Sequence, residues 1–233
     1  MMDIKAIYSY TKASILDSFY AEEYSDSINE IFWVRMAHSI PHKELERRHR
    51  KSGVVRLNKP LILELGGGNG EHIKYVQQDF EKYIVTDLRK IHTENLSKKI
   101  IRKTMNAEAI TFQDNSFDRV IVTCLLHHLS DPWECIREIN RVLKPKGQAD
   151  IFIPCDPGII FRLFRNVFFK AYFRKHNKKK YKILLDALDH QNHCGSLIKL
   201  CQYGFQERKV KLKYYPFGIK LWNLNLFVII QVS

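Results

Sequence analysis

The amino-acid sequence predicts an α/β fold, in which helices cover both faces of a mostly parallel sheet. Three observations support this prediction. Apolar segments of strand length alternate with helical segments between residues 60 and 155, as in sheets built from βαβ units. The first apolar segment, 61–65, runs directly into a glycine-rich turn. The second, 82–86, is followed by Asp87, so residues suited to ligand binding follow both strands.

The residues before the first strand, 1–58, predict a helical cap. Apolar residues recur at helical spacing from Thr11 to His38, which predicts two helices. Pro41 predicts a break after them, because proline inside a helix removes a hydrogen bond and clashes with the preceding turn. A charged stretch, 42–52, then leads toward the first strand.

The central region predicts five strands and three helices. The strands are expected at 61–65, 82–86, 101–105, 118–124 and 148–154, and the helices at 70–80, 89–99 and 132–143. Pro132 suits the first position of its helix, where a missing N–H costs nothing. Lys146 and Gly147 predict a turn into the fifth strand.

After Pro154 the pattern changes to a basic helix at 159–180, which contains eight basic residues and no acidic one. Its polar and basic side chains recur at four-residue spacing, and apolar and aromatic residues fill the other face. We expect a lid with a solvated charged face; contact with an anionic membrane and binding of nucleic acid are the alternatives. The remaining predicted elements are a helix at 184–200, interrupted around Cys194 and Gly195, and antiparallel strands at 207–214 and 224–232.

The segment 61–70 reads LILELGGGNG, a glycine-rich turn that follows an acidic residue. A dinucleotide fingerprint starting at Gly66 would need glycine where the chain has Glu71, and the Gly-Lys-Ser/Thr ending of a P-loop is absent. The carboxylate of Glu64 would repel a pyrophosphate and suits a cationic or amine-bearing ligand.

These segments resemble, in order, the motifs of class I S-adenosylmethionine (SAM)-dependent methyltransferases, in particular the small-molecule superfamily that includes the ubiquinone-type enzymes. The glycine turn resembles motif I, and the later motifs correspond to 83–87, 106–108, 112–118, 125–132 and 141–147. The resemblance implies a Rossmann-like, seven-stranded sheet with one antiparallel strand and helices on both faces. It also implies an N-terminal cap at 1–58 and a methyltransferase domain at 59–233, with a helical lid inserted at about 156–200.

The resemblance implies SAM as the cofactor. Gly66, Gly68 and Gly70 should line it, because a side chain there would collide with the ligand. Glu64 should orient the turn or reach the cofactor's amino group through water. Asp87 should accept hydrogen bonds from both ribose hydroxyls, and capping of the next helix is the alternative.

Further cofactor contacts follow from the later motifs. Asn106 and Ala107 stand where the family often has Asp-Ala beside the adenine, and the Asn106 side-chain oxygen can accept from the exocyclic amine. Thr123 and Leu125 should flank the methionine part. Cys124 is expected to pack, because direct methyl transfer needs no enzyme nucleophile.

Three histidines are candidate general bases, because histidine exchanges protons near neutral pH. His127 and His128 follow the fourth predicted strand, and His128 is favoured because adjacent residues cannot easily both face a pocket. The alternative is that the pair packs as part of the loop. His190 lies in a polar cluster where the family often builds a lid, and a solvated helix end is the alternative. No metal is expected, since His190, His193 and Cys194 lack a second ligand pair.

Composition narrows the partners and the location. The net charge of +13 favours an anionic partner, which could be an acidic substrate, a membrane surface or nucleic acid. No apolar run reaches the ~20 residues of a membrane span, and the first residues lack a signal pattern. Five scattered cysteines indicate reduced thiols. We therefore expect a cytoplasmic protein, with contact at the inner membrane face as a further expectation.

The cofactor motifs do not identify the acceptor. Our first hypothesis is a small or lipid-linked, anionic acceptor, methylated on a sugar hydroxyl of a surface-glycan precursor, because sugars favour aromatic and polar side chains. A quinone- or lipid-type acceptor is the next. An RNA methyltransferase is disfavoured, since no added RNA-binding module and no Asn/Asp-Pro-Pro-Tyr/Phe motif is found in the sequence. A non-catalytic SAM-binding regulator is the alternative from another class.

Overall fold

A computed structural model of the 233-residue chain describes residues 32–52, 59–89, 97–175 and 191–233. The helices expected between Thr11 and His38 therefore lie almost entirely outside the described residues, as does most of the helix expected at 89–99. His190 also lies outside them.

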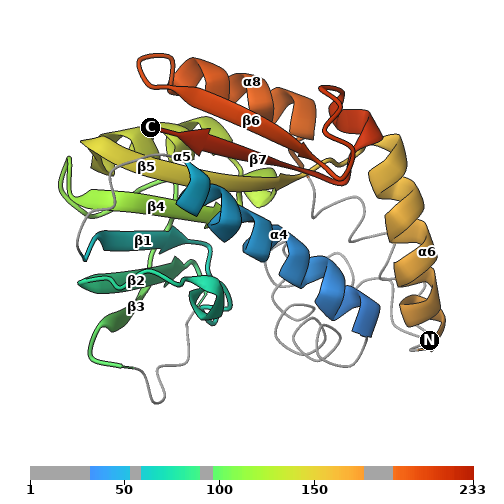
Figure 1. The fold of residues 1–233 in the computed structure, drawn as a ribbon, viewed down its shortest axis with the longest axis horizontal. Coiled ribbons are helices and arrows are strands. Elements are labelled where there is room, and N and C mark those ends of the chain that lie inside the picture. Colours follow the sequence, from blue (N-terminus) through green and yellow to red (C-terminus); the bar gives the residue numbers. More distant parts are fainter. Residues whose placement is uncertain (1–31, 53–58, 90–96, 176–190) are drawn as a thin grey trace, which may run out of the picture.

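The core of the molecule is a seven-stranded sheet in the order β3-β2-β1-β4-β5-β7-β6 (Figure 1). The first five strands are parallel, and β7 runs antiparallel between β5 and β6. The strands are β1 Leu61–Leu65, β2 Lys82–Asp87, β3 Ile100–Thr104, β4 Phe117–Thr123, β5 Leu143–Pro154, β6 Val210–Tyr215 and β7 Phe227–Val232. The predicted mostly parallel sheet with one antiparallel strand is confirmed.

The described helices are α4 Phe32–Lys51, α5 Pro132–Val142, α6 Ile159–Lys175 and α8 Cys194–Gly204, with 3₁₀ turns η2 Ile73–Tyr75, η3 Leu126–His128 and η4 Trp222–Leu224. Helix α5 begins as predicted at Pro132, and the side chain of Asp131 caps it by accepting from the N–H groups of Trp133 and Glu134. Helix α8 begins at Cys194, where the predicted helix was expected to be interrupted. None of these helices is long and apolar enough to cross a bilayer, within the residues described.

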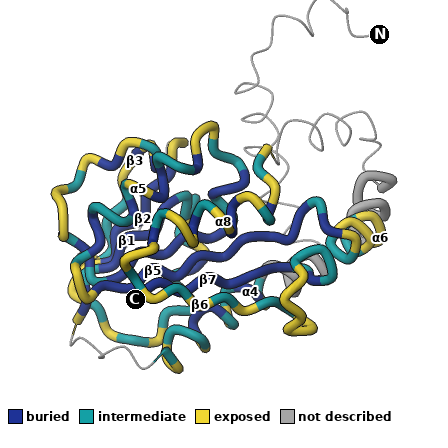
Figure 2. Tube along the Cα trace, turned by 90° about the horizontal axis from the view of Figure 1, so that it is seen from above, coloured by how far each residue is buried: buried dark blue, intermediate teal, exposed yellow. Residues whose placement is uncertain are grey.

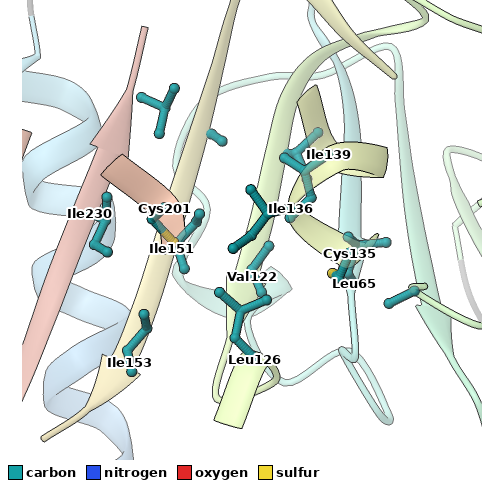
Figure 3. Close-up of a cluster of buried hydrophobic side chains, with 14 of the residues drawn as sticks. Leu65, Val122, Leu126, Cys135, Ile136, Ile139, Ile151, Ile153, Cys201 and Ile230 are labelled. Atoms are coloured by element: carbon teal, nitrogen blue, oxygen red, sulfur yellow. The ribbon is translucent and has the colours of Figure 1, made fainter. Parts of the chain in front are cut away.

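The two faces of the sheet carry different helices because side chains alternate along each strand. On one face, Ile136 and Ile139 of α5 and Cys201 of α8 pack over Val122 and Ile151 (Figure 3). On the other face, a second apolar cluster joins α4 to the sheet, with members Leu45, Ile62, Tyr83, Val85, Ile121, Phe152, Phe227 and Ile229. The central strands are thus buried on both sides (Figure 2), as expected for a parallel sheet.

The helix predicted at 70–80 is wrong. The structure has only the 3₁₀ turn η2 in this segment, and Val76 is already extended. His72 points inward, is 0% exposed and contacts α4. Helix α4 covers the sheet face beside this segment, and η2 packs against it.

Two other boundaries differ from the prediction. Helix α4 continues through Pro41. Pro41 is buried, so packing compensates for the hydrogen bond that its ring removes. Strand β5 begins at Leu143, and Gly147 lies inside it beside a register shift rather than in a turn before it.

A buried network of charged side chains ties α4 to the sheet. Arg119 of β4 is 1% exposed, and its guanidinium donates to Glu46 of α4 and to Asp150 of β5, each at 2.7 Å. His49 Nδ1 lies 2.9 Å from Asp150 Oδ2, and His72 Nε2 lies 2.8 Å from Glu46 Oε1. A helix and two strands therefore share one set of buried charges.

Both carboxylates of this network are ionised at neutral pH. Burial alone would raise the pKa of Glu46, but the charge of Arg119 and hydrogen bonds from His72 and Arg119 hold that pKa at about 2. For Asp150 burial also opposes ionisation, yet Arg119 and His49 hold its pKa well below the usual range. Gln231 of β7 adds a hydrogen bond of 3.0 Å to Asp150 Oδ1.

Candidate active site

The glycine-rich turn, 66–70, joins β1 to η2 at the carboxyl edge of the parallel strands. Gly66 has φ +64°, where a side chain is strained, and a Cβ there would lie 2.7 Å from Leu125 Cδ1, so the Leu125 side chain would have to shift. Gly68 has φ +50°, and the one atom within 4 Å of a Cβ there would be Asp87 Oδ2, at 4.0 Å. The turn therefore leaves open space beside a carboxylate, where a ligand can approach the backbone closely.

Side chains from two neighbouring strands hold the turn in place. Asp87, at the end of β2, accepts a hydrogen bond from the Gly68 N–H through Oδ2 at 3.0 Å. Arg102, on β3, donates from Nη2 to the carbonyl oxygen of Asn69 at 2.5 Å. The turn is thus shaped by contacts outside its own sequence.

The carboxylate of Asp87 is 6% exposed and also contacts Arg89. Its Oδ1 accepts from the backbone N–H of Arg89 at 3.0 Å and from Arg89 Nε at 3.1 Å. Arg89 Nη2 adds a fourth, longer bond to Oδ2 at 3.5 Å. The helix that Asp87 would cap, which the sequence left as the alternative, lies largely outside the described residues. A carboxylate has about four acceptor positions, so a ribose hydroxyl would have to displace part of the Arg89 contact, and the ribose role remains a prediction.

Glu64 lies beneath the turn rather than beside the open space. Its side chain is 1% exposed, and Tyr83 on β2 donates its hydroxyl to Glu64 Oε2 at 2.9 Å. A Cβ on Gly67 would lie 2.7 Å from Glu64 Cδ, so the carboxyl supports the turn directly. Burial raises the pKa of Glu64 to about 8, against the opposing hydrogen bond from Tyr83. Glu64 is thus mostly neutral at pH 7.

Asn106 and Ala107 follow β3 at the same edge of the sheet. Asn106 is exposed, and its Oδ1 accepts from the backbone N–H of Glu108 at 2.9 Å. Ala107 is buried in the main apolar cluster. The side-chain oxygen of Asn106, which we expect beside the adenine, therefore already accepts one hydrogen bond. The exocyclic amine of adenine would donate to its second lone pair.

The residues after β4 approach the glycine turn from the other side. Thr123 ends the strand and is buried, and Cys124 follows with φ +53°. Leu125 is half-buried and contacts Gly66. Thr123, Leu125 and the turn thus lie together, as the prediction of a shared methionine pocket requires.

His127 and His128 are placed differently, although their ring centroids are 3.8 Å apart. His127 is 3% exposed, and its carbonyl oxygen accepts from the N–H groups of Gln191 and Asn192 at 3.0 and 3.2 Å. His128 is half-buried, so it is more exposed than His127. Of the two, His128 is the better placed to meet an acceptor, and the catalytic role stays a prediction.

The segment that begins at Gln191 is hydrogen-bonded to the loop at 126–129, which carries His127 and His128. Asn192 donates from Nδ2 to the carbonyl oxygens of Leu129 at 2.7 Å and Leu126 at 3.4 Å. Asn192 is therefore bonded to a loop that is distant in the sequence, and His193 forms the N-cap position of α8. No three His, Cys, Asp or Glu side chains within the described ranges are grouped to hold a metal ion.

Sequence reasoning missed three contacts at this site: Tyr83 with Glu64, Arg89 with Asp87, and Arg102 with Asn69. A signal existed for Tyr83, because it shares a face of β2 with Val85, which is in register with Glu64. Arg89 and Arg102 carry no such signal, because one follows a strand and the other lies on an edge strand, where charged residues are ordinary.

Comparisons with known proteins agree with this fold. Residues 63–150 match the family model described as a methyltransferase domain. The demethylmenaquinone methyltransferase of Bacillus cereus (strain B4264) is 27% identical over 178 residues, which cover 70% of this chain and 72% of that protein.

Solved structures share the fold at low sequence identity. The 1,6-didemethyltoxoflavin-N1-methyltransferase of Burkholderia thailandensis, determined with S-adenosylhomocysteine bound, has a TM-score of 0.59 at 12% identity, covering 100% of this chain and 91% of that one. A SAM-dependent methyltransferase from Mesorhizobium loti has a TM-score of 0.54 at 12% identity, covering 81% and 97%.

The sheet order, the glycine turn with its buried acid and the matched domain together define the class of this protein. The chain is a class I SAM-dependent methyltransferase. It is an enzyme that transfers methyl groups, and SAM is its cofactor. The open space at Gly68 beside the Asp87 carboxylate fits a nucleoside whose ribose needs hydrogen-bond acceptors.

Proposed function

We propose that this methyltransferase acts on a small acceptor carried by a lipid, at the surface of an anionic membrane. One observation carries the proposal: Ile159, Leu163 and Val167 form an exposed apolar row on α6, each more than half exposed. Helix α6 follows β5 at the carboxyl edge of the sheet, where open α/β sheets bind their ligands. Apolar surface beside an active site suits a substrate with an apolar carrier.

Two acceptors fit this proposal. One is a sugar hydroxyl of a lipid-linked glycan precursor, which is our hypothesis from the sequence. The other is a quinone ring, and the similarity to a demethylmenaquinone methyltransferase supports it. The net charge of +13 favours an anionic carrier such as a phosphorylated lipid.

We propose that Asp87 binds the ribose hydroxyls, that Asn106 and Ala107 meet the adenine, and that Gly66 and Gly68 approach the cofactor with their backbone. Bound SAM would supply a methyl group activated by its sulfonium, and the electron pair of the broken C–S bond would stay with the sulfur. The protein aligns the acceptor with that group and excludes water. For a hydroxyl acceptor, His128 takes the proton as the new C–O bond forms.

A turnover assay with radiolabelled SAM tests this function. The acceptors are a menaquinone precursor lacking the methyl group, an undecaprenyl-linked sugar, and bulk RNA as the comparison. Label in either lipid-linked acceptor, with release of S-adenosylhomocysteine, is the expected result. Label in RNA alone would assign the enzyme to nucleic acid. Tight SAM binding without turnover on any of the three would contradict the proposed acceptor class and favour a regulator.

A further inference from the structure

Six large apolar side chains are exposed at one end of the molecule. Helix α6 contributes three of them, and the 216–221 loop after β6 contributes the others; together they are Ile159, Leu163, Val167, Phe217, Ile219 and Leu221, which are 44 to 68% exposed. Strands β5 and β6 run in the same direction, because each pairs antiparallel with β7. Both segments therefore follow strands that end at the active-site edge of the sheet.

The row on α6 faces away from the core in a fixed orientation. Ile159, Leu163 and Val167 are spaced by four residues, so they share one side of the helix. Phe161 packs against the main apolar cluster, and Arg165 forms an ion pair with Asp156 at 3.4 Å. These contacts hold the opposite side of the helix against the protein.

The loop is also held in place from beneath. Asn225 is 0% exposed, and its Nδ2 donates to the carbonyl oxygens of Ile219 at 2.9 Å and Leu221 at 2.8 Å. The turn η4, which follows the loop, packs against α6 (Figure 1). The loop therefore presents its apolar side chains from a fixed backbone beside the helix.

Positive charge surrounds this apolar surface. Arg162 is exposed on α6 and Lys220 is exposed within the loop. A Cβ on Gly218 would lie 3.4 Å from Lys213 Nζ, so a third cation reaches the loop. The sequence from 208 to 233 contains no acidic residue. Apolar side chains flanked by cations are the chemistry of surfaces that enter an anionic lipid interface.

We propose that the α6 row and the 216–221 loop form one docking surface that seats the enzyme on an anionic membrane, with the active-site edge toward the lipid. The assignment rests on the proposed function, because a lipid-linked acceptor would then reach the site from the bilayer. Binding of RNA would account for the cations but not for the exposed apolar row. Contact with a second copy of the chain would account for the apolar row but not for the cations. An anionic membrane accounts for both.

The test is co-sedimentation of the full chain with vesicles of phosphatidylcholine, with and without phosphatidylglycerol. We expect binding only to the anionic vesicles, and weaker binding as salt is added. The double variant Leu163→Ser, Val167→Ser should lose at least about tenfold in vesicle affinity, because each removed side chain loses insertion into the interface. Arg162→Glu with Lys220→Glu should lose about as much.

Matched controls lie on α8. Tyr203 is 64% exposed and Lys199 is exposed, so Tyr203→Ser and Lys199→Glu remove similar groups from another surface. Both should bind vesicles like the unaltered protein. Equal binding to neutral vesicles, or binding that survives both double variants, would overturn the assignment. A dimer in light scattering that the Leu163→Ser, Val167→Ser variant dissolves would instead assign the surface to a second copy.

Turnover on a short-chain, water-soluble quinone separates this inference from the proposed function. Unchanged turnover in the Leu163→Ser, Val167→Ser variant, with vesicle binding lost, is the expected result. Vesicle binding without methylation of any lipid-linked acceptor would leave the docking surface standing and remove the acceptor. Methylation of the lipid-linked acceptor without vesicle binding would support the proposed acceptor and refute the docking surface.

Discussion

At the scale of single residues, Glu64 on β1 and Asp87 on β2 have different surroundings, although both lie at the same edge of the sheet. Glu64 is buried beneath the glycine turn and mostly neutral, whereas Asp87 borders the open space. The sequence assigned them different roles through the family resemblance, but it could not show that Glu64 is buried and neutral. Their partners make the difference: Glu64 is bonded to the Tyr83 hydroxyl, whereas Asp87 is bonded to Gly68 and Arg89.

We expect Asp87→Ala to weaken SAM binding by about 1–3 kcal/mol, because charge-assisted hydrogen bonds to the ribose are lost. Calorimetric titration with SAM and S-adenosylhomocysteine measures the change. Asp87→Asn is the control for turn shape, since its amide oxygen can still accept from Gly68. Unaltered affinity in a folded Asp87→Ala protein would refute the ribose assignment.

For Glu64, the prediction concerns the pH dependence of stability. Its pKa is raised from 4.5 to about 8 in the folded state, so the folded state binds the proton more tightly than the unfolded chain. Its contribution to the free energy of unfolding is therefore fully present below pH 4.5 and falls by about 3–5 kcal/mol as pH rises through 8. Urea titrations across this pH range measure the free energy of unfolding of the parent protein and of Glu64→Gln. If Glu64 does not titrate there, the two proteins should show the same pH dependence.

His128→Gln should lower kcat by about 10²- to 10⁴-fold on a hydroxyl acceptor, because the proton then lacks an acceptor in the transition state. SAM affinity should not change, which calorimetry would confirm. Single-turnover rates on both acceptor types add a check: a quinone carbon needs less help with its proton. A variant within about threefold of the parent rate would remove His128 from the mechanism.

At the scale of elements, strands were easier to predict than helices. Each central strand is a short apolar run, and its burial on both faces is visible locally. The helix prediction for segment 70–80 was wrong because the conformation of this segment depends on α4, which covers that face of the sheet and binds His72. Helix α4 itself passes through Pro41, because its packing against the sheet outweighs a local breaking signal.

Removal of Arg119 tests how α4 is attached. Arg119→Met should lower the free energy of unfolding by about 3–5 kcal/mol, because Glu46 and Asp150 would remain as buried, unpaired charges. Arg137→Met is the matched control: its ion pair with Glu134 is surface-exposed and should contribute less than about 1 kcal/mol. Equal effects of the two substitutions in urea unfolding would contradict a buried anchor.

At the scale of the whole molecule, the ordered motifs predicted the sheet and the cofactor, because both depend on short segments at carboxyl strand ends. The sequence also singled out the basic helix but ranked a solvated lid first. Its exposed apolar row depends on which side of α6 meets the core, and Phe161 and Arg165 settle that through contacts formed only on folding. The acceptor is not encoded in the motifs, because these concern the cofactor.

The network around Arg119 also has a consequence for biosynthesis. His49 is separated from Asp150 by 101 residues, and Asp150 from Gln231 by another 81. At roughly 5–20 residues per second, α4 leaves the ribosome at least several seconds before its partners on the sheet exist. Helix α4 therefore stays undocked until β4 and β5 have been made. The last bond of the network, from Gln231 to Asp150, forms only after translation has reached β7.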